Sequence, residues 1–241
     1  MKKFGLLIFL IFTNTLFSQT LLLEENFNFS GDLTANGWTA FSSGGTSPIK
    51  TTSGLSYSGY PSSGIGNAAL INANGEDDYL PLSSTQNSGI IYVSLLVNAS
   101  NATTASGGDY FFGLGSTAAG TVAGRLYLLK SGSNFAFGIS KTTGTPTFTN
   151  FDYIFNSTYL IVIKYIINNG SSNDDVALFI FSGAVPMSEP TPTIIQPTES
   201  SNDPSNISVV ALRQNSTTNI VSVDGIRAAT AWSQAPLPVE L

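Results

Sequence analysis

The hydrophobic pattern of the chain is strongest between residues 151 and 181, where two apolar runs flank a polar loop. Residues 159–167 and 176–181 are rich in β-branched and aromatic side chains and contain no glycine or proline. The intervening loop, residues 168–175, consists of types that tolerate turn conformations, so the pattern predicts a long β-hairpin. Because the first run is apolar at both alternating sets of positions, we expect it to lie centrally in a sheet, with one face in the core and the other beneath a loop.

Shorter runs of the same kind recur along the chain, separated by loops rich in glycine, serine and asparagine. Residues 182–203 and the proline that follows them carry five prolines, which predict an extended crossover and not a central strand. No helical period is sustained after the first residues of the chain. Apolar or alternating runs predict further strands at residues 21–27, 38–41, 67–74, 88–97, 110–114, 124–130, 134–140, 207–214 and 219–227.

About ten to twelve strands in one domain predict an all-β fold, a two-sheet antiparallel β-sandwich of the jelly-roll type, with a closed barrel as the alternative. Residues 1–18 combine a basic start, an apolar run and a polar end, which is typical of a secretory signal peptide. The apolar run is too short to span a bilayer. We therefore expect a leader at residues 1–18, a single sandwich domain at 19–234 and a linker at 235–241.

The composition narrows the possible functions. Only 10% of residues are charged, the formal net charge is −6, and the chain has no cysteine and no histidine. The lack of a basic footprint argues against nucleic acid and anionic membranes as partners, and no stable membrane insertion is expected once the leader is removed. Disulfides, thiolate zinc sites and histidine-dependent catalytic triads are excluded. The predicted location is secreted or at the cell surface.

Several segments together resemble a domain found in exported proteins of Bacteroidota-type bacteria. The resemblance covers nearly all of residues 21–232. In that group the domain is similar to concanavalin A-like (laminin G-like) jelly rolls, lies at the N-terminus of surface or secreted proteins and has no assigned activity. The final LPVEL resembles the junction that leads, in such proteins, to a type IX secretion sorting region. The segments are LLEENFNF, NGWTAFSSGGTSPI, SGYPSSGIGNAALI, GDYFFGLG, RLYLLKSGSNFAFGISK, TYLIVIKY with NDDVALFIF, and ALRQ with VDGIRAATAW.

Aromatic side chains on loops are the usual means by which sandwiches hold sugars, because a flat ring stacks on the apolar face of a saccharide. Trp38, Tyr57, Tyr60 and Tyr110 are the candidate ligand-binding residues. Tyr57 and Tyr60 lie in a loop rich in glycine and serine, which favours exposure. The alternative for Trp38 is a place in the core, where large aromatic side chains are most often found.

Two acidic segments are candidates for a structural calcium site, because Ca²⁺ prefers oxygen ligands. One contains Glu76, Asp77 and Asp78, and the other contains Asp174 and Asp175. Neither has the spacing of an EF-hand. The alternatives are solvated loop charge, or aspartates that cap their own turns.

These observations favour a secreted, non-catalytic recognition module that binds a polysaccharide or cell-surface glycan or acts in adhesion. Glucanases of the concanavalin-like fold carry paired glutamates with an aspartate between them on one strand, and this chain has no such strand. A carboxylate pair brought together by the fold stays open, since glycoside hydrolysis needs two carboxyl groups about 5–9.5 Å apart. The alternatives are therefore a structural spacer in a multidomain surface protein, or a glycoside hydrolase.

Overall fold

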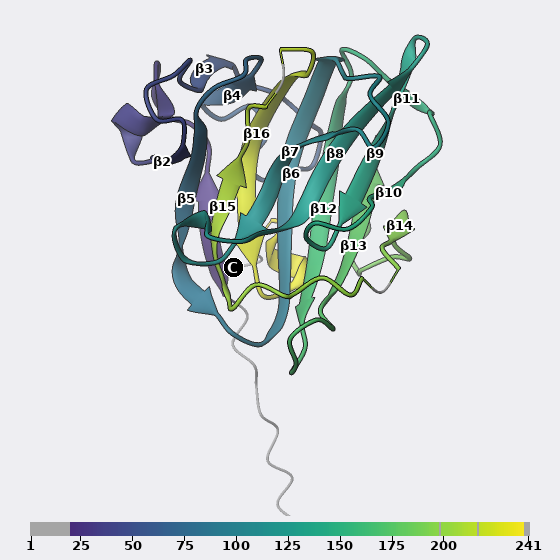
Figure 1. Cartoon of the computed structure of the whole chain (residues 1–241). Coiled ribbons are helices and arrows are strands. Elements are labelled where there is room, and N and C mark those ends of the chain that lie inside the picture. The colour runs from purple at the N-terminus through teal and green to yellow at the C-terminus, as the bar shows by residue number, and fades with distance from the viewer. Residues whose placement is uncertain (1–19, 198, 216, 239–241) are drawn as a thin grey trace, which may run out of the picture.

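The computed structural model describes residues 20–197, 199–215 and 217–238, and it forms a sandwich of two antiparallel sheets (Figure 1). The predicted leader, residues 1–18, lies outside the described residues. Sheet A has the order β14-β13-β12-β6-β16-β4-β3, with β1 also paired to β16; sheet B has the order β10-β9-β8-β7-β15-β5-β2, with β11 also paired to β9. Both sheets end in open edges, so the sandwich prediction is confirmed and the closed-barrel alternative is wrong.

The strands of sheet A are β1 (Leu21–Glu25), β3 (Lys50–Ser53), β4 (Asn67–Ile71), β6 (Gly89–Asn101), β12 (Thr158–Ile167), β13 (Asp175–Phe181), β14 (Ile194–Ile195) and β16 (Ile220–Ala229). Those of sheet B are β2 (Thr39–Ser42), β5 (Asp77–Gln86), β7 (Asp109–Gly115), β8 (Val122–Ser131), β9 (Asn134–Ser140), β10 (Thr147–Phe148), β11 (Tyr153–Ile154) and β15 (Ile207–Leu212). In the described part of the chain, three short 3-10 helices lie in the connections: η1 (Leu33–Asn36), η2 (Thr117–Ala119) and η3 (Trp232–Gln234). No helix among the described residues is long and apolar enough to cross a membrane.

The predicted hairpin is present as β12 and β13, which pair in register from Leu160 with Phe181 to Ile166 with Asp175. β12 also pairs along its whole length with β6, so it is central in sheet A. Ile161 and Ile163 face the core between the sheets, whereas Val162 belongs to a second apolar cluster on the outer face. The apolar character of both faces of this strand therefore has the predicted cause.

Two segments cover the outer face of sheet A. The loop that follows β3 packs Tyr57 and Tyr60 against Leu96 and Leu160. The chain after β16 packs Trp232 and the residues that follow it against Tyr92. Ala235 is fully buried and Leu237 is 5% exposed, so the sandwich domain extends at least to residue 237 and the first part of the predicted linker belongs to it.

Strand β5 was missed from the sequence, because its residues DDYLPLSSTQ are mostly polar and include Pro81. Its neighbours explain why the proline is tolerated. On one side β5 pairs with β15, and the register between these strands shifts just beyond Pro81; on the other side β2 pairs only with residues 77–79. Pro81 therefore lies beyond the end of β2, at a locally unpaired edge where the missing N–H group is not needed.

Candidate ligand-binding pocket

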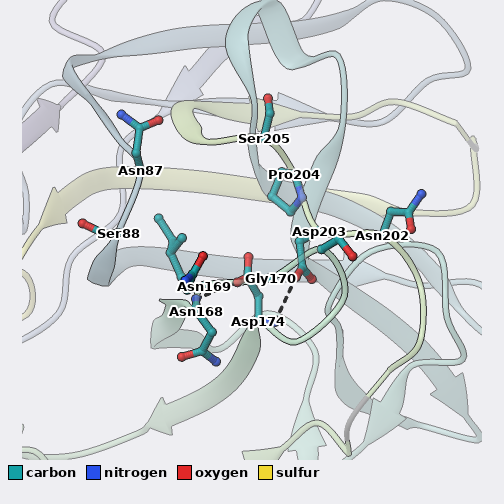
Figure 2. Close-up of a pocket in the computed structure, with 12 residues that line it drawn as sticks. Asn87, Ser88, Asn168, Asn169, Gly170, Asp174, Asn202, Asp203, Pro204 and Ser205 are labelled. Carbon is teal, nitrogen blue, oxygen red and sulfur yellow. Dashed lines mark hydrogen bonds between the residues drawn. The ribbon is translucent and has the colours of Figure 1, made fainter.

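A pocket of about 600 Å³ opens at the end of the sandwich where the β12–β13 loop lies (Figure 2). Three segments that are far apart in the sequence form its walls: the β5–β6 turn, the β12–β13 loop and the end of the long crossover before β15 (Figures 1 and 2). The lining residues are Asn87, Ser88, Ile167, Asn168, Asn169, Gly170, Ser171, Asp174, Asn202, Asp203, Pro204 and Ser205.

Asp174 holds the loop closed at the floor of this pocket. Its carboxylate accepts the backbone N–H of Asn168 at 2.7 Å and the phenol O–H of Tyr165 at 3.0 Å. Asp174 is only 4% exposed, and this burial raises the pKa of its carboxyl while the N–H of Asn168 opposes the rise. The aspartate therefore caps its own loop, as one of the alternatives from the sequence predicted.

Asp203 ties the crossover to the same loop. One carboxylate oxygen accepts the backbone N–H groups of Asn173 at 2.7 Å and Asp174 at 3.2 Å. The other oxygen forms an ion pair of 2.6 Å with Lys141, and both side chains are almost completely buried. An ion pair shielded from water in this way holds its two segments together strongly, because separating the partners would leave a charge without compensation.

Glu199 binds the crossover to the segment that follows β9, at a second point besides Asp203. Its carboxylate accepts the backbone N–H groups of Lys141 and Gly144 at 3.0 and 2.7 Å, and it also bonds to Thr142. Burial opposes ionisation of Glu199, but hydrogen bonds from Ser201, Gly144 and Thr142 outweigh that effect and lower its pKa. Two walls of the pocket, the β12–β13 loop and the crossover, are therefore held by bonds within the protein that do not depend on a ligand.

The side chains left free to meet a ligand are amides and hydroxyls. Within the described residues, the side-chain amides of Asn87, Asn169 and Asn202 make no hydrogen bond to the protein, and all three residues are exposed. Each amide offers both a donor and an acceptor. Ile167 and Pro204 add a small apolar surface. This arrangement suits a neutral ligand with many hydroxyl groups.

The four predicted aromatic residues lie outside this pocket, and three of them are buried. Trp38 is 3% exposed and stacks on Phe27 with ring centroids 5.8 Å apart, so the expectation that Trp38 contacts a ligand is corrected and its core alternative is confirmed. Tyr60 is 4% exposed, because its side chain lies between its own loop and sheet A, where its hydroxyl contacts Ser94 at 2.9 Å and donates to the carbonyl of Gly225 at 2.5 Å. Its exposure was predicted wrongly, because the loop folds back onto the sheet.

Tyr60 should instead contribute to stability. Replacing it by phenylalanine removes the hydroxyl and leaves the buried carbonyl of Gly225 without its partner, so we expect the free energy of unfolding to fall by about 1–3 kcal/mol. Equilibrium unfolding in urea measures the change. The control is Tyr79→Phe, whose partly exposed hydroxyl has no hydrogen bond among the described residues. Equal losses in the two variants would contradict the assignment.

Tyr57 is buried as well, at 9% exposed, so its predicted exposure is also wrong, whereas Tyr110 is partly exposed. Tyr57 lines a separate pocket of about 620 Å³, and its hydroxyl donates to the carbonyl of Gly183 at 2.5 Å. Burial raises the pKa of Tyr57 to about 12, so the phenol is neutral at any physiological pH. Tyr110 is partly exposed on the outer face of sheet B. A ligand-binding role for these two residues stays a prediction.

The two acidic segments do not come together. Glu76 and Asp78 are 2% and 0% exposed, and Asp77 is 8% exposed, so the alternative of solvated loop charge is wrong for this segment. Asp77 accepts the backbone N–H of Gln214 at 2.7 Å. Asp175, in contrast, is exposed at the start of β13. Within the described residues, no group of three or more acidic side chains is placed to hold a metal ion, and the calcium site stays a prediction.

The sequence indicated candidate functional residues in only one wall of the pocket, the loop of residues 168–175. Asn87 and Asn202 carried no signal, because single asparagines are common in this chain's loops. The partnership of Lys141 with Asp203 joins residues 62 positions apart, and only the packing of the crossover onto sheet B brings them together. The proline spacing predicted that crossover, and Asp203 lies within it directly before Pro204. This neighbouring proline was the only signal in the sequence that pointed to Asp203.

Comparison with known proteins supports the fold. No family model matches the chain, and no curated protein sequence matches it. Among solved structures, the globular domain of T. cruzi calreticulin is 13% identical, with a TM-score of 0.52 over 87% of this chain and 88% of that one. Domain 4 of AbnA, a GH43 extracellular arabinanase from Geobacillus stearothermophilus, in complex with arabinotriose, is 17% identical with a TM-score of 0.46, over 91% and 95% of the two chains. The carbohydrate recognition domain of Emp46p is 10% identical with a TM-score of 0.44, over 88% and 96%. At such identities the likeness to the calreticulin domain shows a shared two-sheet sandwich fold.

Proposed function

We propose that the protein is a secreted, non-catalytic module that binds a glycan in the pocket between the β12–β13 loop, the β5–β6 turn and the crossover. The observation that carries this proposal is the set of unpaired amides of Asn87, Asn169 and Asn202 around a pocket in which bonds within the protein hold the β12–β13 loop and the crossover. A preformed site loses little conformational entropy when the ligand binds, which favours recognition.

The chemistry of the pocket supports a hydroxyl-rich ligand more than an ionic one. Side-chain amides and serine hydroxyls both donate and accept hydrogen bonds, as sugar hydroxyls do. The two carboxylates of the pocket, Asp174 and Asp203, already accept bonds from the protein. Because they are engaged in holding the loop, they are not free to act as the acid and base of a glycosidase, which supports binding without catalysis.

A glycan array probed with residues 19–241 tests the proposal, with plant, algal and bacterial polysaccharides and with and without calcium. We expect binding to at least one polysaccharide, and at least a tenfold weaker affinity for the double variant Asn169→Ala with Asn202→Ala. Each lost hydrogen bond contributes about 0.5–1.5 kcal/mol, and 1.4 kcal/mol corresponds to a factor of ten.

The control is Asn150→Ala, which removes an exposed asparagine outside the pocket and should leave binding unchanged. Uniformly absent binding would contradict the proposal and favour a structural spacer. Release of reducing sugars from any polysaccharide of the array would instead support the hydrolase alternative.

A further inference from the structure

The outer face of sheet B carries a group of aromatic and arginine side chains that the pocket does not include. Side chains alternate between the two faces of a strand, so Arg125 and Tyr127 of β8 point away from the core that holds Leu126 and Leu128. Val209 and Ala211 of β15 pack on the same outer side with rings from neighbouring strands. We call this surface the aromatic-arginine face; its members are Phe41, Tyr79, Tyr110, Arg125, Tyr127 and Arg213.

Two guanidinium groups converge on one tyrosine of this face. The guanidinium carbons of Arg125 and Arg213 lie 4.7 and 4.2 Å from the centroid of the Tyr110 ring. Tyr110 is on β7, whereas Arg125 is on β8 and Arg213 directly follows β15, the two strands that flank β7. Contacts of this kind hold a guanidinium in a defined orientation and contribute about 0.5–2 kcal/mol.

The two arginines differ in their partners. Arg213 forms an ion pair of 2.7 Å with Asp109. Arg125 donates its Nε–H to the carbonyl of Val122 at 3.0 Å and has no carboxylate partner among the described residues. Five of the seven described lysine and arginine side chains are in ion pairs, so the unpaired and partly buried guanidinium of Arg125 is unusual in this acidic chain: the paired ones are Lys50, Lys141, Lys164, Arg213 and Arg227.

The other charged groups of this surface do not neutralise Arg125. The carboxylate of Asp109 is used by Arg213, and its side chain is 14% exposed. Asp77 is 8% exposed and directs one oxygen to the backbone N–H of Gln214. The terminal nitrogens of Arg125 therefore keep unused donors beside a partly exposed ring. A guanidinium with free, orientated donors is the group that binds carboxylate and sulfate oxygens in pairs.

We propose that the aromatic-arginine face is a second saccharide-binding site, selective for a sugar that carries an anionic group. Arg125, held in place by the Tyr110 ring, binds the carboxylate or sulfate of the sugar, and the partly exposed ring of Tyr79 contacts the saccharide. The inference rests on the proposed glycan-binding function, but it assigns a different surface and a ligand class that the amide-lined pocket does not select. The two sites share no residue.

Isothermal titration of residues 19–241 with two matched pairs of polymers tests the inference. Polygalacturonate is compared with its fully methyl-esterified form, and dextran sulfate with dextran, so that each pair shares a sugar backbone but only one member carries anionic groups. The two pairs separate carboxylate from sulfate. We expect at least one acidic polymer to bind at least tenfold more tightly than its neutral partner. This affinity should fall as sodium chloride rises from 50 to 500 mM, because salt screens the charge interaction.

Single substitutions test whether the acidic polymer binds at the aromatic-arginine face. Arg125→Gln should weaken binding of the acidic polymer at least tenfold, whereas Lys50→Gln, which removes an equal charge from an exposed pair with Asp32, should not. The pocket variant Asn169→Ala with Asn202→Ala should leave the acidic polymer bound. Thermal unfolding checks that Arg125→Gln folds. If it does not fold, the comparison of the polymer pairs and the salt series still test the inference on the unaltered protein.

The outcomes separate this inference from the proposed function. Equal affinity for charged and neutral forms, or unchanged binding by Arg125→Gln, would overturn the inference. If neutral glycans bind and the pocket variant alone abolishes that binding, the proposed function stands and the second site does not. If no polysaccharide of either kind binds, both proposals fail.

Discussion

Replacing Lys141 by methionine is expected to lower the free energy of unfolding by about 3–5 kcal/mol. Lys141 and Asp203 form an ion pair of 2.6 Å with side chains that are 2% and 4% exposed. Methionine keeps most of the buried side-chain volume but leaves the carboxylate of Asp203 without a counter-charge in a site that excludes water. A loss of this size is a large part of the 5–15 kcal/mol that stabilises a typical domain.

Urea unfolding at pH 7 measures this loss, and the matched control is Lys50→Met. Lys50 also pairs with an aspartate, Asp32, but these side chains are 62% and 39% exposed. Exposed pairs contribute about 0–1 kcal/mol, so the control should change little. The double variant Lys141→Met with Asp203→Asn should recover part of the stability, since no charge then stays buried alone. Similar losses from Lys141→Met and Lys50→Met would contradict the assignment.

The same substitution bears on the pocket. Asp203 accepts the backbone N–H groups of Asn173 and Asp174, so the ion pair reaches the β12–β13 loop through these two bonds. Under conditions where Lys141→Met is still folded, we expect it to weaken glycan binding in the pocket and to leave binding at Arg125 unchanged. This result would separate the two proposed sites without any substitution in either.

The second large effect concerns the buried carboxyl groups of Glu76 and Asp78. Asp78 lies on β5 and Glu76 directly precedes that strand, and both side chains are buried. Both oxygens of Asp78 and Oε1 of Glu76 have no hydrogen-bond partner among the described residues. Burial, together with the charge of Glu76, raises the pKa of Asp78 to about 7. One proton shared by the two carboxyls would satisfy an oxygen of each.

The pH dependence follows from the direction of this shift. The unfolded chain releases the Asp78 proton near pH 3.9, whereas the folded chain keeps it until about pH 7. Between these values the folded state binds more protons, so the contribution of Asp78 to stability falls as the pH rises through this window and is constant above it. At about 1.36 kcal/mol per unit of pKa, the fall is at most about 4 kcal/mol.

Asp78→Asn removes this titration. We expect the variant to be more stable than the unaltered protein at pH 8, to lose that advantage towards pH 4, and to show the difference in urea unfolding at a series of pH values. The control Asp175→Asn makes the same change of charge at an exposed position and should show no such trend. If 1 mM calcium stabilises the unaltered protein but not Asp78→Asn, the two carboxyls hold the predicted metal ion and do not share a proton.

Local pattern was a good guide to the fold where burial is continuous. The β12–β13 hairpin is read correctly because its apolar residues face packed surfaces on both sides, which makes the run unmistakable. Strand β5 has no such run. Its place between β15 and β2 is set by pairing with strands distant in the sequence, so the polar stretch around Pro81 gave no local signal.

Burial of individual polar and aromatic residues was the least predictable property. Tyr60 and Asp78 both lie in segments that look like solvated loops, yet the loop that carries Tyr60 folds back on sheet A and Asp78 is fully buried. The Tyr57 and Tyr60 loop differs from an exposed one only in what lies beneath it. The surface beneath the loop is sheet A, and the residue of that sheet that Tyr60 contacts, Ser94, is more than 30 positions away in the sequence.

The amino-acid sequence alone therefore determined the all-β class, the central hairpin and the proline-rich crossover. It also excluded disulfides, thiolate zinc sites and histidine-dependent catalytic triads, because the chain has no histidine or cysteine. These properties depend on composition and on short periodic runs, which are local. Only the tertiary structure decided that Lys141 meets Asp203, that Glu76 and Asp78 share a buried site, and that two arginines flank Tyr110. The first and third of these contacts join side chains from different strands or loops, and Glu76 and Asp78, although two positions apart, are buried only because their segment is covered by the rest of the fold. In every case the positions are set by the register and packing of the two sheets.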